Sequence, residues 1–438
     1  MDLLKDNVGK LYRKFFIASF GSALIACIYG LVDMAMVGQY HGPDGSAAMA
    51  VIAPIWNIIY SFGLLCGIGG SVIYAVARGE RDDVKAANGY FTSAFILGSL
   101  WALILWVLVW VCEEPLLRLF GANDALMPLC KEYMVAPKLT VPVYVFINLL
   151  SSFLRNDGDP GRATKAVIFG GIFNVFGDYF FVFTLDMGIK GAGIATAMGA
   201  SMSVLVMLTH FISKKNTLKF VKPPRILNSF KMISVNGFSS FIVDVAMGIA
   251  TMLFNRRVME YLGTDALAVY GVIVVVGTLV QCCSYGIGQA AQPVISRNFG
   301  AGLTDRIKTM LKYNIITAAV FGAIWTVLSM AMPQVFIKLF MTPTPEVLSI
   351  APGIIRIYAI SFVLLPFNIY STYYFQAIMR AKISLIASVA RGIVISGALI
   401  LLLPVAFGGN AVWWAMPITE AVVFVYSAVM MKKVKLSR

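Results

Sequence analysis

The sequence contains little charge. Only 13% of its 438 residues are Asp, Glu, Lys or Arg, whereas about 25% is ordinary for a soluble domain. Apolar residues make up 59% of the chain, which is enough to fill twelve membrane spans of about 20 residues each. This composition excludes a soluble protein with a single hydrophobic core and predicts an all-α integral membrane protein.

Residue types that support catalysis, metal binding or cofactor binding are also scarce. The chain has two histidines, His41 and His210, which lie toward opposite sides of the predicted membrane, and six cysteines without the paired spacing of a metal site or a disulfide framework. The sequence has no Walker motif, so ATP is not the expected energy source. We therefore predict no enzyme, no catalytic residues and no cofactor. Nucleic acid is not an expected partner despite the net charge of +14, because the basic residues lie between apolar segments.

Long apolar runs bounded by charge, proline or glycine predict twelve transmembrane helices. None of the runs alternates polar and apolar residues as the strands of a membrane β-barrel do. No small-residue cleavage pattern follows the first run, so we expect a spanning helix there and not a cleavable signal peptide. The predicted spans lie near residues 15–37, 47–76, 90–112, 133–154, 165–185, 191–213, 232–255, 265–295, 313–333, 352–379, 383–406 and 411–431.

The basic residues gather on one side of the predicted spans. The side that carries the N-terminus holds 26 of the 35 Lys and Arg residues, the opposite side holds eight, and Arg391 lies inside a span. Because positively charged loops stay in the cytoplasm, this bias predicts that the N-terminal side is cytoplasmic. An even number of spans then places both termini in the cytoplasm.

The sequence also repeats itself. Gly67-Ile68-Gly69 recurs 219 positions later as Gly286-Ile287-Gly288, each near the end of the second span of its half. The repeat predicts two pseudo-symmetric six-helix bundles related by an axis along the membrane normal. We expect an N-terminal lobe over residues 1–213, a polar cytoplasmic linker over 214–231 and a C-terminal lobe over 232–438.

Acidic residues inside apolar spans are informative because each costs about 2.5 to 3.5 kcal/mol at the bilayer centre. Asp33 and Asp178 lie in the first and fifth predicted spans. Asn174 precedes Asp178 by one helical turn and shares its face, and Thr196 lies in the first turns of the sixth span. Their oxygens suit a proton or a hard cation such as Na⁺. Taken singly, Asn174 is equally suited to a hydrogen bond between helices, and Thr196 to a helix cap.

Five short motifs resemble those of the multidrug and toxic compound extrusion (MATE) transporters. The resemblance extends over nearly the whole chain, and the fourth-to-fifth-span loop is most similar to the MepA-type bacterial branch. The motifs are Val32–Gly38, Asn174-x-x-x-Asp178, Arg155-Asn156-Asp157-Gly158-Asp159-Pro160, Gly191–Thr196 and Trp413-Trp414-Ala415-Met416-Pro417.

The resemblance implies a V-shaped pair of six-helix lobes in a bacterial inner membrane. Such a protein would export cationic or amphipathic drugs by antiport with Na⁺ or H⁺ through alternating access. The implied coupling site consists of Asp33, Asn174, Asp178 and Thr196. Small-molecule drugs and the lipid bilayer are the expected partners, and we expect a monomer.

The second half departs from the family pattern. Some relatives carry a glutamate in helix 7 and an aspartate in helix 10, whereas here helix 7 has Asp244 and helix 10 has no acid. Asp244 and Glu420 either bind a cationic substrate or pair with Arg391. Tyr29 and Gln281 complete the residues that we expect to contact substrate.

Two other functions remain open from the sequence. A lipid-linked oligosaccharide flippase of the same superfamily would be expected to place more basic residues in its central cavity. A polytopic membrane enzyme would need His, Cys or acidic residues grouped at one membrane interface. The sequence does not identify the drugs or choose between Na⁺ and H⁺.

Overall fold

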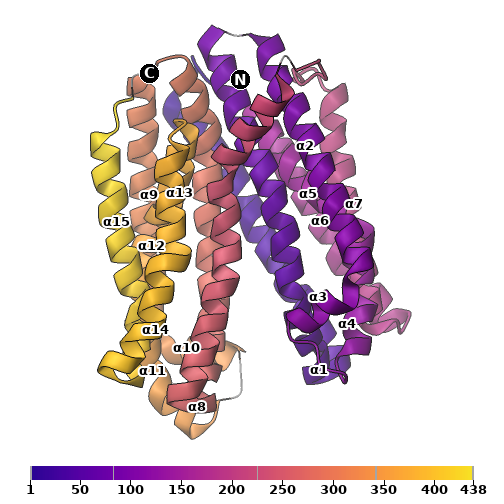
Figure 1. Cartoon of the computed structure of the whole chain (residues 1–438), viewed down its shortest axis with the longest axis vertical. Helices are drawn as coiled ribbons and strands as arrows, with labels where there is room; N and C mark the ends of the chain where they lie inside the picture. The colour runs from indigo at the N-terminus through magenta and orange to yellow at the C-terminus, as the bar shows by residue number, and fades with distance from the viewer. Residues whose placement is uncertain (1, 82, 224, 341–342, 437–438) are drawn as a thin grey trace.

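The computed structural model describes residues 2–81, 83–223, 225–340 and 343–436, and its regular structure there is entirely helical (Figure 1). The first half of the chain contains α1 (Val8–Arg81), α2 (Val84–Val111), α3 (Glu113–Leu119), α4 (Met127–Tyr133), α5 (Val135–Asn156), α6 (Pro160–Asp178), the π-helix η1 (Tyr179–Thr184), α7 (Gly188–Leu208) and η2 (Thr209–Ile212). The second half contains α8 (Ile226–Gly300), α9 (Thr304–Ala331), α10 (Pro333–Phe340), α11 (Pro345–Ala359), α12 (Ser361–Ala377), α13 (Ala381–Val389), the π-helix η3 (Ala390–Val394), α14 (Ile395–Phe407), η4 (Gly409–Trp414) and α15 (Ala415–Lys433).

The first helix of each half is interrupted at one glycine. In α1, Gly42 has φ 64°, and in α8, Gly263 has φ 81°. Glycine adopts positive φ without steric cost, so each position lets the chain turn back across the membrane. Figure 1 shows both helices descending from the end that carries the N-terminus and returning to it.

The twelve predicted crossings are confirmed. Eleven helical segments among the described residues are long and apolar enough to span a membrane, and one of them, Ile226–Gly300, contains the reversal at Gly263 and crosses twice. The helices extend several residues beyond the predicted spans, since α1 starts at Val8 and α8 at Ile226. Three short helices, α3, α4 and α10, were not predicted.

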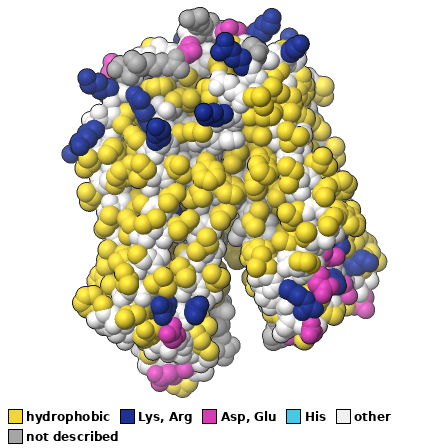
Figure 2. Space-filling model, in the orientation of Figure 1, with side chains coloured by type: hydrophobic (Ala, Val, Ile, Leu, Met, Phe, Trp, Pro, Cys, Tyr) yellow, Lys and Arg dark blue, Asp and Glu magenta, His cyan; other side chains and the backbone are white. Residues whose placement is uncertain are grey.

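The helices form two groups, α1 to α7 and α8 to α15, that touch at one end and separate at the other (Figure 1). Both chain termini lie at the closed end. Figure 2 shows a cleft between the groups at the opposite end, an apolar surface over most of the length, and Lys and Arg side chains gathered over the closed end. We call these groups the N-lobe and the C-lobe.

Glycines hold the two lobes in backbone contact near the closed end. A Cβ atom on Gly69 would lie 2.2 Å from the carbonyl oxygen of Ile233, and one on Gly300 would lie 2.0 Å from that of Val76. Any side chain at these positions would force the helices apart. The absence of Cβ atoms is therefore what allows α1 and α8 to close this end of the molecule.

The start of α1 belongs to the core of the opposite lobe. Leu11 and Phe15 are fully buried in a cluster made largely of C-lobe side chains, and Asn298 of α8 donates a hydrogen bond of 3.0 Å from Nδ2 to the Leu3 carbonyl. The later part of α1 packs among N-lobe helices, where Val37 is fully buried in an N-lobe cluster. A single helix thus connects the two lobes.

Candidate cation-binding site and central cavity

Asp33 lies on α1 with its carboxylate buried. The side chain is 7% exposed, and the Tyr133 hydroxyl at the end of α4 donates a 3.0 Å hydrogen bond to Oδ2. Oδ1 has no hydrogen-bond partner among the described residues. One half of this carboxylate is therefore oriented by protein and the other half is available to a ligand.

Asn174 and Thr196 meet where α6 and α7 pack closely. A Cβ atom on Gly170 would lie 2.7 Å from the Gly199 carbonyl oxygen, so the two backbones can approach only because both residues are glycine. Across this contact, Asn174 Nδ2 donates a 3.3 Å hydrogen bond to Thr196 Oγ1. The side-chain oxygen of Asn174, Oδ1, has no hydrogen-bond partner among the described residues.

Asp178 is the last residue of α6 and directly precedes the π-helix η1. Its side chain is fully buried, and within the described chain neither carboxylate oxygen has a hydrogen-bond partner. It lies close enough to Asp33 for the two charges to interact. Single π-helical turns inside α-helices are often found at functional sites because they reorient one side chain.

The two aspartates form an acidic pair without a counter-ion. Neither has a basic partner in the part of the chain that the structure describes, and burying unpaired carboxylates is costly. Four oxygens are unpartnered, one each on Asp33 and Asn174 and both on Asp178. A proton or a hard cation would satisfy these oxygens. No group of three or more His, Cys, Asp and Glu side chains that could hold a metal ion occurs among the described residues.

In the C-lobe, Asp244 of α8 faces a tyrosine. Tyr285 donates a 2.8 Å hydrogen bond from its hydroxyl to Asp244 Oδ1, and Gln281 Nε2 donates to the Tyr285 hydroxyl at 2.5 Å. Asp244 Oδ2 has no partner in the described structure. Gln281 thus contacts the predicted acid through one intermediate side chain.

Glu420 is already neutralised by its own lobe. Arg391 Nε donates to Glu420 Oε1 at 2.7 Å, and Asn368 Nδ2 donates to Oε2 at 2.6 Å. Glu420 is fully buried. The sequence left open whether Glu420 binds a cationic substrate or pairs with Arg391. In the structure it pairs with Arg391. Asp244 only lines the same small pocket as Arg391.

A central cavity lies between the lobes and has about 120 Å³ of room for water. Tyr29, Asn174 and Thr196 line it from the N-lobe, and Cys282 and Tyr285 of α8 line it from the C-lobe. Several rings surround this space, so it combines aromatic walls with polar groups, as small-molecule sites commonly do. Asn174 and Thr196 connect the cavity to the acidic pair.

One wall of this cavity is formed by residues of α5 that the sequence did not predict. Asn148, Ser151, Ser152 and Arg155 of α5 all line it, and their i, i+3, i+4 and i+7 spacing places them on one helix face. The predicted fourth span ends at residue 154, which places Arg155 in the following cytoplasmic loop and leaves Arg391 as the one basic residue within a span. That assignment was wrong, because α5 continues to Asn156 and Arg155 is only 7% exposed. The spacing of these four polar residues along one helix face is the sequence pattern that could have predicted this wall.

The comparison with protein families decides the assignment of the chain. The MatE family model matches residues 18–180 and matches again over 237–401, which together make up most of the sequence. The chain belongs to the MatE family. The two matches fall one in each lobe, as expected of an internal repeat. Because MatE is a family of transporters, the chain is not classed as an enzyme.

Relatives of this MatE chain carry an efflux name. It is 24% identical over 423 residues to the "Multidrug export protein MepA" of Staphylococcus haemolyticus, covering 95% of the chain and 92% of the relative. The protein of the same name from Staphylococcus saprophyticus is 23% identical over 426 residues, with the same two coverages.

Solved structures share the fold of the MatE chain. A multidrug resistance MATE family transporter of the MOP superfamily, described in an outward-facing conformation, superposes with a TM-score of 0.89 at 22% identity, covering 98% of this chain and 97% of that one. A MOP superfamily transporter from Pyrococcus furiosus, whose binding pocket is described as having reversed polarity that suggests a different function, reaches 0.87 at 22% identity, covering 99% and 98%. These likenesses confirm the predicted architecture.

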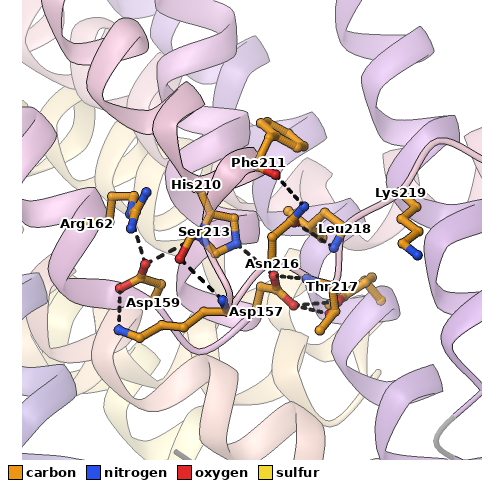
Figure 3. Close-up of polar contacts among 12 residues, drawn as sticks. Asp157, Asp159, Arg162, His210, Phe211, Ser213, Asn216, Thr217, Leu218 and Lys219 are labelled. Atoms are coloured by element: carbon orange, nitrogen blue, oxygen red, sulfur yellow. Dashed lines mark hydrogen bonds and ion pairs between the residues drawn. The ribbon is translucent and has the colours of Figure 1, made fainter.

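A second polar network fixes the segment between the lobes to the N-lobe (Figure 3). His210 is fully buried and lies 2.8 Å through Nε2 from Asp157 Oδ2. The Thr217 backbone N–H donates to the same oxygen at 2.9 Å, and Asn88 Nδ2 donates to the Thr217 carbonyl at 3.0 Å. The chain is therefore attached to N-lobe helices well beyond the end of η2.

Asp159 is the acid of this network that contacts Arg162 and Lys215. It accepts from Arg162 Nε at 3.0 Å and Lys215 Nζ at 3.4 Å, and it faces His210 Nδ1 at 3.4 Å. Burial opposes its ionisation, but Lys215 and Arg162 outweigh that effect and hold the pKa of Asp159 below its ordinary value. The interlobe segment is thus held by an ionised carboxylate near the closed end.

Proposed function

We propose that this MatE chain is a secondary active multidrug efflux transporter that exports cationic or amphipathic small molecules by antiport with Na⁺ or H⁺. The observation that carries the proposal is the buried Asp33–Asp178 pair beside a tyrosine-lined cavity between two lobes. The names of the MepA relatives support the same function. Asp33, Asn174, Asp178 and Thr196 are proposed to bind the coupling ion.

The proposed orientation places the closed end in the cytoplasm. Lys and Arg side chains gather at that end (Figure 2), which agrees with the rule that positive loops remain inside. Both termini are then cytoplasmic, and the cleft opens outward. We place the chain in a bacterial inner membrane, as a monomer with residues 1–213 and 232–438 as lobes and 214–231 as linker.

In the proposed cycle, an ion enters from outside and neutralises the acidic pair. Neutral carboxylates favour a different packing of α1 against α6 and α7, since the repulsion between Asp33 and Asp178 disappears. The first turns of α1 are buried in the C-lobe through Leu11 and Phe15. Movement of α1 would therefore change the relation between the lobes, and drug is released as the ion binds.

Opening toward the cytoplasm requires the glycine contacts of α1 and α8 to separate. Gly69 and Gly300 make two of these close approaches, and they bury backbone against backbone without interlocking side chains. Such an interface can part without unpacking large side chains. This suits a protein that must alternate between two arrangements.

An oligosaccharide flippase is the weaker alternative. Its lipid-linked pyrophosphate substrate would need several basic groups, whereas Arg155 is the one basic residue among the described residues that line the cavity. The efflux function is therefore favoured.

The test is transport by the purified chain in proteoliposomes. Ethidium movement is followed by fluorescence under an imposed Na⁺ gradient and, separately, under an imposed pH gradient, with protein-free liposomes as control. We expect one of the two gradients to drive ethidium against its concentration gradient. If neither gradient drives movement of any cationic dye above the control, the proposed function is wrong.

A further inference from the structure

Arg155 carries a charge that the protein does not balance. It is the one charged side chain among the described residues that line the central cavity. Nη2 donates a 3.1 Å hydrogen bond to Ser22 Oγ on α1, and the buried Nε has no partner. No carboxylate of the described chain makes a salt bridge with it. Leaving a buried cation unpaired is costly, so a partner from outside the chain would be favourable.

Arg155 faces the boundary between the lobes. It lines the central cavity together with Tyr60 of the N-lobe and Tyr285 of the C-lobe. It lies at the end of the polar face formed by Asn148, Ser151 and Ser152. This face lines the wall of the cavity along α5 and ends at the guanidinium.

An opposite charge lies behind Tyr285, on the C-lobe side of the same cavity. Asp244 accepts a hydrogen bond from Tyr285, which lines the central cavity, and Asp244 Oδ2 has no partner among the described residues. Arg155 and Asp244 do not form a salt bridge with each other. The cavity and the Tyr285 side chain thus lie between a cation of the N-lobe and an anion of the C-lobe. A molecule with two opposite charges would satisfy both.

We propose that Arg155 binds the anionic group, a carboxylate or a comparable acid, of a zwitterionic amphiphile whose cationic end faces Asp244. A guanidinium presents several N–H donors in a fixed plane and suits a carboxylate in particular. This assignment names a substrate class and rests on the proposed efflux function. It is separate from the coupling site, which contains only acidic and neutral side chains.

The experiment compares two dyes that differ at one group. Rhodamine B carries a free carboxylate beside its cationic ring system, whereas its ethyl ester carries only the cation. Binding is measured by fluorescence polarisation with the purified full chain in detergent, which requires no gradient. We expect Arg155→Gln to weaken binding of rhodamine B by about tenfold or more, the size of one charge-assisted hydrogen bond, and to leave the ester within about twofold.

Two further variants sharpen the comparison. Arg155→Lys keeps the charge without the planar fork and should recover part of the rhodamine B affinity. Arg13→Gln makes the same change at an exposed position of α1 and should leave both dyes unaffected. The assignment is wrong if wild type binds the acid no more tightly than Arg155→Gln does, or if Arg155→Gln weakens both dyes equally.

Transport of the same dyes separates this inference from the proposed function. Arg155-dependent binding of rhodamine B without gradient-driven movement of either dye would contradict the efflux function and leave the anion subsite intact. If the ester is transported and Arg155→Gln leaves rhodamine B binding unchanged, the efflux function is supported and the anion subsite is wrong.

Discussion

Charged residues lie at corresponding points of the two lobes, but their charges and their partners differ. The fifth span of each lobe contains a π-helix, η1 in the N-lobe and η3 in the C-lobe. Asp178 lies beside the first and Arg391 lies inside the second. The first span of each lobe carries an acid, Asp33 or Asp244. The N-lobe thus combines two acids, and the C-lobe combines an acid with a base.

This difference indicates which lobe needs an ion. In the C-lobe, the tethered guanidinium of Arg391 already pairs with Glu420 at 2.7 Å and lines a pocket with Asp244. In the N-lobe, the buried oxygens of Asp178 have no partner in the described structure. The comparison therefore supports placing ion coupling in the N-lobe and structural charge compensation in the C-lobe.

The largest expected effect is the loss of the C-lobe ion pair. Glu420→Ala leaves Arg391 buried without its carboxylate and should lower the free energy of unfolding by about 3 to 5 kcal/mol. Unfolding in mixed dodecyl maltoside and SDS micelles would measure it. The double variant Glu420→Met with Arg391→Leu removes both charges and should recover most of the loss. Equal stability of Glu420→Ala and wild type would mean that the pair contributes nothing.

The next largest effect concerns the N-lobe pair. Asp178→Asn removes one carboxylate charge at nearly constant volume, so we expect little change in expression or stability but a fall of about 100-fold in gradient-driven ethidium export, the upper range for coupled sites. Asp33→Asn should behave alike. Export by either variant at the wild-type rate would place the coupling site elsewhere.

A smaller effect is expected at Asp244. Asp244→Asn keeps the hydrogen-bond acceptor for Tyr285 and removes the charge that lies behind this cavity-lining tyrosine. Affinity for ethidium should fall by about three- to tenfold, roughly 1 kcal/mol, with little change in the maximal rate, because we propose that this residue contacts the drug and not the ion. A fall in maximal rate with unchanged apparent affinity would instead indicate that Asp244 takes part in coupling.

The smallest effect concerns the network near the closed end. The pKa of Asp159 is held below its ordinary value. The contribution of its carboxylate to the free energy of unfolding is therefore present at neutral pH and is lost as the pH falls through that lowered pKa. Acidification from about pH 6 to about pH 3 should therefore cost wild type about 1 kcal/mol more than it costs Asp159→Asn. Thermal unfolding across this range would measure the difference.

Asp305→Asn is the matched control for that prediction, since the Asp305 carboxylate is 94% exposed. Its dependence on pH should follow that of wild type. Parallel curves for wild type and Asp159→Asn would show that Lys215 and Arg162 do not stabilise the folded chain through this carboxylate.

The positions of the membrane spans were the best predicted feature. The twelve apolar runs correspond to twelve crossings, because a bilayer fixes both the length and the polarity of a spanning helix. The short helices α3, α4 and α10 were missed because seven or eight residues between spans carry no membrane signal. The internal repeat was visible in glycines, two of which pack closely against the opposite lobe: Gly69 against Ile233 and Gly286 against Phe20.

For the site, the sequence could nominate residues but not their partners. Asp33 and Asp178 stood out because charge is costly in an apolar span, yet their proximity depends on packing between α1 and α6. The choice between drug and Arg391 for Glu420 also needed the tertiary structure. Arg155 was missed because a basic residue next to a Gly-Asp-Pro loop suggests a cytoplasmic position until the helix end is known.

The most direct test of the difference between the lobes is ion binding by the purified protein. Binding of radioactive Na⁺, and proton uptake in weakly buffered solution, would be measured for wild type, Asp178→Asn and the double variant Glu420→Met with Arg391→Leu. We predict that wild type and the double variant take up one of the two ions and that Asp178→Asn does not. Uptake that survives Asp178→Asn but disappears with the C-lobe pair would contradict the account.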